Sequence, residues 1–507
     1  MIRLLAPGAA AAPLSAAESY GLSVLVDLSR LLILDSTERT PDREPVTVTV
    51  VDGGEWSASA LLRGDYGYAV HEGSVGVPRA LLDAVTEIAG AALEQRSTGA
   101  DRHGRVPSAE NPLVAGDCSR DPVVSRAAVA LRRAVIQAAG PRPVRVVAPW
   151  PARSRWAIAL THDLDVGSLW PAFAALRVAE LARKGAIRDA GRVIGAGLAS
   201  ALTQPLVGSP VRRAVRRILD IERHAGVPST WYVIAGVRTL RTLAAGDVTY
   251  TAGARAVRRL LHALAGDACE IGLHGSFATG MSDTAVAFAA ERHRLGAAIR
   301  RGEEDAGTER YVRPALSGVR QHYLRMRPGK TQRRMIEAGF SYDATYGYPD
   351  RNGFRLGVAD VVPGWDATAE RATSLAEVPL TWMDRAQSKY QGIEDPARWI
   401  EDAIELAQSC QEVDGLWVGL WHPNMTPALG FPGAPAAYER LVTLLTARAP
   451  YAATVGDIVA WRRLRSAVRA RGVGPDGRVV LDGPPSRALE VLTDDGAGRS
   501  AEVLSTT

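Results

Sequence analysis

The sequence is poor in cysteine and in lysine. Its 507 residues include only three cysteines, Cys118, Cys269 and Cys410, which are far apart in the chain. This number and spacing exclude a disulfide framework and a cysteine-rich zinc module. Only three of the 60 basic residues are lysines, and the arginines are scattered among 55 acidic residues. Such mixing argues against a nucleic-acid partner, and we expect the one arginine cluster, at 212–217, to be a solvated helix face.

Long apolar runs are also missing. No segment reaches the roughly 20 apolar residues of a membrane-spanning helix, so we expect no transmembrane segment. Residues 1–13 have one arginine and a short alanine-rich stretch broken by Pro7 and Pro13, unlike a signal peptide. We therefore expect a cytoplasmic location, with export as the alternative. Hydrophobic residues make up 47% and charged residues 23%, the balance of a globular protein long enough for two to four domains.

Shifts in composition divide the chain. Residues 1–100 combine β-branched runs with a helical pattern and indicate a small α+β domain. Residues 101–150, rich in Ser, Gly, Asp, Arg and Pro, indicate a linker with one helix. A (β/α) barrel domain is expected at 151–463, with a helical insertion near 173–209. Residues 464–507 would be a tail or a small β extension.

Short apolar runs recur through the expected domain at 151–463, and each ends in polar or reactive residues. The runs lie at 156–160, 229–234, 268–273, 311–319, 340–346, 376–382 and 416–421. Strands that alternate with helical stretches favour parallel βα units. When such units close into a barrel, the carboxyl ends of the strands meet on one face, where an active site is built. The sequence therefore predicts an α/β fold, a distorted (β/α)7-type barrel preceded by the small α+β domain.

Two carboxylates follow the first of these runs. Because side chains alternate along a strand, Asp163 and Asp165 point to one side and His162 to the other. Adjacent carboxylates are costly unless a cation or proton neutralises one of them. A divalent metal held by one Asp, with the other free to accept a proton, explains the pair. A solvated turn or a helix cap is the alternative.

Three histidines occupy equivalent positions after later runs: His274, His322 and His422. Neutral imidazole is a common ligand of zinc and related ions. A single strand-end histidine is as readily a hydrogen-bonded structural residue. The convergence of all three with Asp163 and Asp165 at strand ends is what favours a metal site.

The ordered motifs resemble a known family. Trp-Ala-Ile-Ala-Leu-Thr-His-Asp-Leu-Asp at 156–165, Glu-Ile-Gly-Leu-His-Gly-Ser at 270–276, Gly-Val-Arg-Gln-His-Tyr-Leu at 318–324 and Leu-Trp-His-Pro at 420–423 are similar to those of the polysaccharide deacetylases (NodB-homology, carbohydrate esterase family 4). The run Ser-Thr-Trp-Tyr-Val at 229–233 belongs to the same series. The resemblance covers about residues 155–463.

The resemblance implies roles for single residues. Asp163 would be the catalytic base, Asp165 and His274 metal ligands, and His422 the general acid. The cofactor would be a divalent metal ion, zinc or else cobalt or nickel. The implied partner is a carbohydrate or glycoconjugate from which an acetyl group, N-acetyl before O-acetyl, is hydrolysed. Oligomeric state is not addressed by the sequence.

The chain departs from the family pattern at one position. A second histidine usually follows the first by four residues, and Ala278 stands there. We propose His322 as the third metal ligand, because it follows a strand end and lies beside Arg320. A contact of His322 with substrate is the alternative.

Further residues are expected to contact substrate: Arg320, which is the arginine of the third motif, Tyr323, Asp343 and Trp421. For the aromatic residues, a place in the core is the alternative. Two other readings of the whole site stay open. One is a degenerate, non-catalytic carbohydrate-binding barrel, and the other is a metal-independent glycosidase using Asp163 with a second carboxylate such as Asp384.

Overall fold

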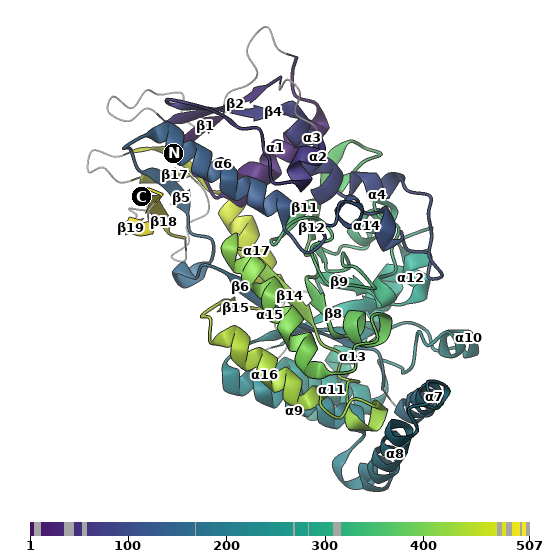
Figure 1. Cartoon of the computed structure of the whole chain (residues 1–507). Helices are drawn as coiled ribbons and strands as arrows, with labels where there is room; N and C mark the ends of the chain where they lie inside the picture. The colour runs from purple at the N-terminus through teal and green to yellow at the C-terminus, as the bar shows by residue number, and fades with distance from the viewer. Residues whose placement is uncertain are drawn as a thin grey trace.

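The computed structural model describes residues 1–4, 12–34, 45–52, 58–167, 169–266, 269–281, 283–307, 316–473, 479–482, 489–496 and 499–502. Its centre is a ten-stranded sheet that curls into a half-barrel with helices on its outer face (Figure 1). None of the helices in these ranges combines the length and the apolar character that crossing a membrane requires.

Parallel strands form most of this sheet. In spatial order they are β10 (Tyr342–Asp343), β9 (Gly318–Gln321), β8 (Glu270–Gly275), β7 (Ser229–Ile234), β6 (Ala157–Leu164), β14 (Leu416–Leu420) and β13 (Trp382–Met383). At the β10 end the sheet continues into β12 (Arg371–Glu377) and the antiparallel β11 (Val362–Asp366), while β15 (Tyr451–Ala452) adds to β6. Residues 311–315 of the run expected at 311–319 lie outside the described residues.

The apolar runs correspond to strands because the sheet is covered. Every residue of β6, β7, β8 and β14 is buried, which explains their nearly continuous apolar sequence. The covering helices are α9 (Pro210–Ala225), α11 (Arg255–Gly266), α13 (Val286–Ala306), α15 (Pro396–Glu412) and α16 (Ala434–Thr446). Among the described residues the strand pairing is an open path from β11 to β13, so the closed (β/α)7 form stays a prediction.

The N-terminal part has its own sheet, in the order β1 (Ile2–Leu4), β2 (Val46–Val51), β4 (Ser74–Pro78) and β3 (Ala69–His71). Helices α1 (Ala16–Ser29), α3 (Arg79–Ala89) and α6 (Val123–Ala139) pack with it. Their apolar cluster also takes in Val358 and Val362 of the central part. The two parts therefore share a core, and the division into domains remains a prediction.

The C-terminal tail contributes strands to two small sheets. Strand β18 (Val491–Asp494) pairs with β19 (Arg499–Glu502) and with β5 (Val144–Val147), which lies in the Pro-rich segment expected to be a link. Strands β16 (Arg469–Val473) and β17 (Val479–Asp482) pair after helix α17 (Val455–Ala467).

The insertion expected near 173–209 is a pair of helices, α7 (Trp170–Arg183) and α8 (Ile187–Val207), which we call the α7–α8 hairpin. It stands out from the body at the lower right of Figure 1. The remaining helices and turns are α2 (Ala58–Leu62), α4 (Ala92–Arg96), α5 (Pro112–Ala115), α10 (Leu240–Ala244), α12 (Phe277–Met281), α14 (Lys330–Glu337), η1 (Ser108–Glu110), η2 (Pro151–Arg153), η3 (His322–Leu324), η4 (Ala386–Tyr390) and η5 (Pro427–Leu429).

Candidate active site

The predicted acids and histidines meet at one edge of the half-barrel. Asp163 lies near the end of β6 and Asp165 directly after it, His274 is in β8, His322 follows β9, and His422 follows β14. Parallel pairing brings these strand ends to the same edge. There they line a cavity of about 460 Å³. The convergence inferred from strand-end positions is thus present in the structure.

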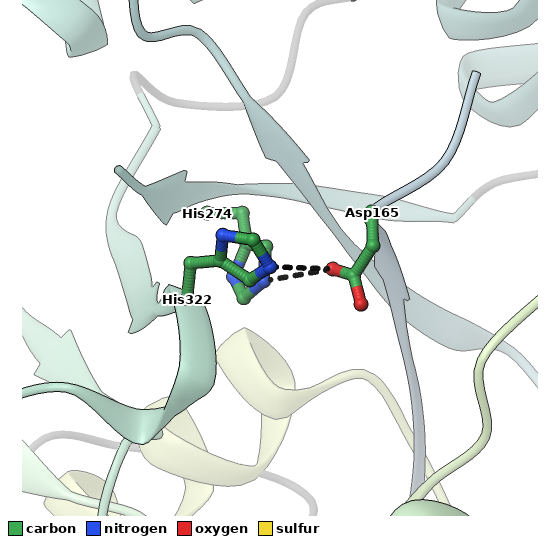
Figure 2. A group of neighbouring side chains, drawn as sticks. All are labelled: Asp165, His274 and His322. Carbon is green, nitrogen blue, oxygen red and sulfur yellow. Dashed lines mark ion pairs between the residues drawn. The ribbon is translucent and has the colours of Figure 1, made fainter. Parts of the chain in front are cut away.

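Asp165 is at the centre of the group. Its Oδ1 lies 3.2 Å from His274 Nε2 and 3.7 Å from His322 Nε2, as the dashed lines in Figure 2 show. Its Oδ2 lies 3.5 Å from His422 Nε2. Three imidazoles from three strands therefore present the same nitrogen to one carboxylate.

A separate partner holds the far side of each imidazole. The Nδ1 atom of His274 lies 2.9 Å from the carbonyl oxygen of Arg320. His322 Nδ1 lies 3.0 Å from Asp247 Oδ1, and His422 Nδ1 lies 2.6 Å from Asp384 Oδ1. Such contacts fix ring orientation and, with the proton on Nδ1, leave the Nε2 lone pair free for a ligand.

His162 shows the contrasting case. Its Nδ1 lies 2.8 Å from the carbonyl oxygen of Trp421 and its Nε2 lies 2.8 Å from Glu222 Oε1, so both nitrogens are engaged by the protein. The side chain is fully buried against Trp231 and Tyr438, away from the cavity that Asp163 and Asp165 line. The strand alternation predicted this orientation, and the structure confirms that His162 is turned away from the site.

The donor atoms suit a divalent cation. One ligand atom each from Asp165, His274 and His322 can be chosen so that all three lie within 4.8 Å of one another. Asp165 Oδ1 and His274 Nε2 are buried, yet within the described chain neither makes a hydrogen bond. Buried acceptors without a donor are costly. One carboxylate and two imidazoles with a position left open is a donor set that zinc and similar ions accept.

The electrostatics of the group favour charged forms. Burial alone raises the pKa of Asp165, but His322, His274 and His422 outweigh it and hold that pKa well below the ordinary value. Burial alone lowers the pKa of His274, yet Asp163 and Asp165 raise it overall. For His422 the same balance holds, and Asp384 makes the largest contribution to the raised pKa.

Arg320 is a buried neighbour of Asp163. Its side chain is fully buried, and its Nη1 donates to Asp163 Oδ1 at 3.0 Å and to Thr161 Oγ1 at 2.8 Å, while Nε donates to the carbonyl of Ala344. The guanidinium also lies over the ring of Tyr232, 4.4 Å from its centroid. Arg320 therefore holds Asp163 in place and does not line the cavity, which differs from the expected contact with substrate.

Asp343 and Trp421 also lie off the cavity. Asp343 is fully buried, accepts a hydrogen bond from the backbone N–H of Thr345, and lies opposite Glu377 in the pairing of β10 with β12. Trp421 is 3% exposed and its ring packs against Trp382 at 6.0 Å, the core position weighed as the alternative for aromatic residues. Both therefore depart from the expected role in binding substrate.

Tyr323 does line the cavity. Its ring stacks on His103 with centroids 5.0 Å apart, and its backbone has φ 59°, in the left-handed region. A non-glycine residue held in this conformation is typical of functional loops. Tyr323 is the one residue of the four expected to contact substrate that the described part of the chain places on the cavity wall.

Asp247 is a site residue that sequence reasoning did not find. It lies between α10 and α11, is fully buried, and contacts His322. No strand-end position or motif marks it, so the sequence carried no signal for it. Asp384 was considered as an acid of the site, but its contact with His422 was not expected.

The fold and the site together define a class: a mixed α/β half-barrel with a candidate Asp-His-His cation site at the carboxyl ends of its strands. Comparisons with known proteins bear on the particular family. No family model matches the sequence, and no curated protein matches it either.

The structures found to be similar are polysaccharide deacetylases and carbohydrate esterase family 4 proteins, the family that the motifs resemble. A provisionally assigned polysaccharide deacetylase from Mycobacterium smegmatis has 22% identity and a TM-score of 0.40, over 62% of this chain and 92% of that one. The chitin deacetylase of Colletotrichum lindemuthianum has 12% identity and a TM-score of 0.33, over 61% and 89%. A family 4 pseudoenzyme from Bacillus anthracis has 11% identity and a TM-score of 0.27, over 64% and 70%. At such scores the chemistry has to be argued from the side chains of this site.

Proposed function

We propose that this protein is a metal-dependent hydrolase that removes an acetyl group, N-acetyl before O-acetyl, from a carbohydrate. One observation carries the proposal. Asp165, His274 and His322 lie together, and two of their buried acceptor atoms, Asp165 Oδ1 and His274 Nε2, make no hydrogen bond within the described chain. We assign these three residues as the ligands of a divalent ion, zinc before cobalt or nickel. His322 would take the place of the histidine that the family pattern puts at Ala278.

The chain's own residues supply the proton transfers. When bound, the ion supplies positive charge that polarises the acetyl carbonyl and lowers the pKa of water. Asp163, held by Arg320, is placed to accept the proton of the attacking water. His422, whose pKa is raised and whose ring is held by Asp384, is placed to donate a proton to the departing amine. Tyr323 on the cavity wall would contact the sugar.

Acetate release from soluble N-acetylglucosamine oligosaccharides, measured with zinc added and after chelation, tests the proposal. We expect activity only with metal, and a loss of about 10²–10⁴-fold for Asp163→Asn, the usual contribution of a general base. Asp163→Asn should still bind the metal, whereas His274→Ala should lose it. Full activity in both variants would overturn the assignment.

One alternative has a specific observation in its favour. Ala278 removes the usual histidine, so a carbohydrate-binding barrel without catalysis is the second candidate. A protein that binds glycans but retains no zinc by elemental analysis would support it. The glycosidase alternative gains no support, because His422 engages both carboxylate oxygens of Asp384 through Nδ1 and the backbone N–H.

A further inference from the structure

The outer face of helix α8 is apolar and exposed. Five large aliphatic side chains lie along it at intervals of seven, four, four and four residues, which places them on one face of a helix. We call this set the leucine stripe: Ile187 (65% exposed), Ile194 (49%), Leu198 (62%), Leu202 (82%) and Leu206 (88%). The residues between them on this face include Gly191 and Gly195, so the face carries little that is polar.

The opposite face of α8 is already occupied. Ala190, Val193 and Ser200 are buried there, where α8 packs on α7, α9 and the turn η5. The orientation of the helix is therefore fixed by packing. The leucine stripe is left facing outward from a hairpin that projects from the body (Figure 1). Exposed contiguous apolar surface of this kind marks an interaction site.

The charge around the stripe identifies the kind of partner. Residues 170–207, which form the α7–α8 hairpin, contain five basic and two acidic side chains, a net charge of +3. The whole chain of 507 residues has a net charge of +5, so more than half of that excess lies in the hairpin. Arg183, Lys184 and Arg188 cluster where α7 turns into α8, and all three are exposed. Both acids of this segment are engaged locally: Glu180 pairs with Arg177 and Lys184, and Asp189 pairs with Arg192.

An aliphatic face bordered by arginines and lysine is the signature of a helix that lies in the surface of an anionic bilayer. The aliphatic side chains enter the acyl boundary, and the basic side chains contact acidic headgroups. We propose that the α7–α8 hairpin docks on a lipid surface that contains anionic lipid. A convex projecting face suits a bilayer better than it suits a folded partner, which would need a complementary groove.

The hairpin also borders the candidate active site. Phe173, Leu176, Arg177 and Glu180 of α7 line the same cavity as Asp165 and His322. Because α7 packs on α8, docking through α8 would hold one helix of the cavity wall next to the helix that contacts the lipid. The docking itself does not depend on the proposed deacetylase chemistry.

Sedimentation of the full-length protein with vesicles tests the proposal. We expect binding to vesicles of phosphatidylcholine with phosphatidylglycerol, weaker binding to phosphatidylcholine alone, and a decrease with added salt. Leu198→Glu with Leu202→Glu should reduce binding at least tenfold, and so should Arg183→Glu with Arg188→Glu. The matched controls are Val286→Glu, an exposed aliphatic residue on α13 (71%), and Arg300→Glu with Arg301→Glu, an exposed pair on the same helix. Both should bind as the unchanged protein does.

Three results would overturn the proposal. They are absence of binding to anionic vesicles, unchanged binding by the Leu198→Glu/Leu202→Glu variant, and equal losses in the control variants. The alternative is that a second copy of the chain covers the leucine stripe, and light scattering tests this. If the unchanged protein is a dimer that does not bind vesicles, and the Leu198→Glu/Leu202→Glu variant is a monomer, the stripe is a dimer interface. Acetate release from soluble oligosaccharides should be unchanged in the double variant, which separates failure of docking from failure of the proposed function.

Discussion

Two clusters of charged side chains in this protein are similarly buried. They differ in which of their atoms have hydrogen-bond or ion-pair partners. At the candidate active site, Asp165 faces three imidazoles, and Asp165 Oδ1 and His274 Nε2 make no hydrogen bond with any described residue. In the second cluster, Asp360 lies among Arg30, Arg462 and Arg465, and both of its oxygens are paired, at 2.9–3.2 Å. In the described part of the chain, the buried atoms of this cluster that make no hydrogen bond are the Nε donors of Arg30 and Arg465.

The difference distinguishes a binding site from a structural ion cluster. Unmatched acceptors that face a common point can bind a cation, whereas unmatched arginine donors cannot. The Asp360 cluster joins α1, the strand region before β11 and α17, so its pairs connect distant parts of the chain. The burial of the charged groups alone would not distinguish the candidate cation site from the structural Asp360 cluster.

The largest expected effect comes from removing the central carboxylate of each cluster and comparing protein stability and zinc binding in the two variants. Asp360→Asn removes the carboxylate paired with Arg30 and Arg465 and leaves Arg462 with Asp27 alone, and we expect a loss of about 3–5 kcal/mol in the free energy of unfolding. Zinc binding should be unaffected. Asp165→Asn should weaken zinc binding more than a hundredfold, with a smaller loss of stability. Urea unfolding of the metal-free protein and calorimetric zinc titration measure the two effects. The reverse pattern would break the comparison.

A third buried carboxylate lies apart from the candidate cation site and is held by hydrogen bonds. Glu291 is 1% exposed and accepts hydrogen bonds from the backbone N–H and hydroxyl of Ser276. Burial, opposed by those hydrogen bonds, raises its pKa from 4.5 to about 7. The folded protein therefore holds a proton that the unfolded chain releases, and the stability linked to this group falls as pH rises from about 5 to 8.

Glu291→Gln should remove this pH dependence. A shift of this size corresponds to about 3 kcal/mol at most, at 1.36 kcal/mol for each pH unit. We expect the variant to gain stability relative to the unchanged protein at pH 8 and to show little gain at pH 5, as measured by urea unfolding at both pH values. Parallel curves for the two proteins would show that Glu291 ionises normally.

The smallest effect is expected at Asp247. Its carboxylate holds His322 Nδ1, and loss of such a partner lowers metal affinity by about 10–100-fold. Asp247→Asn should show this loss in a zinc titration while the protein keeps its fold by circular dichroism. Glu222→Gln is the matched control, because Glu222 holds His162, which is turned away from the site. An equal loss in both variants would mean that the effect is structural.

The sequence was informative where chemistry follows an apolar run. The runs before Asp163, His274 and His422 are buried strands, and parallel pairing made their ends converge as expected. Alternation along β6 separated His162 from Asp163. These features depend on local periodicity, which a single sequence contains.

Other features depend on packing between distant segments and could not be read from the sequence. Whether Arg320 contacts substrate or Asp163 is decided by its burial against Tyr232, and Asp247 reaches His322 across 75 residues of chain. The helical pattern of α8 likewise did not say which of its faces would stay uncovered.

The proposed ligands come from three strands, and β7 lies between two of them. A histidine at position 278, in α12, would have supplied a second imidazole only four residues after His274 in β8. Instead, 109 residues separate Asp165 from His274 and 48 separate His274 from His322. Closing loops of this length in an unfolded chain is costly in entropy, so an isolated fragment should have little affinity for zinc. Uptake of the ion during refolding would therefore report the moment at which strands β6 to β9 are assembled.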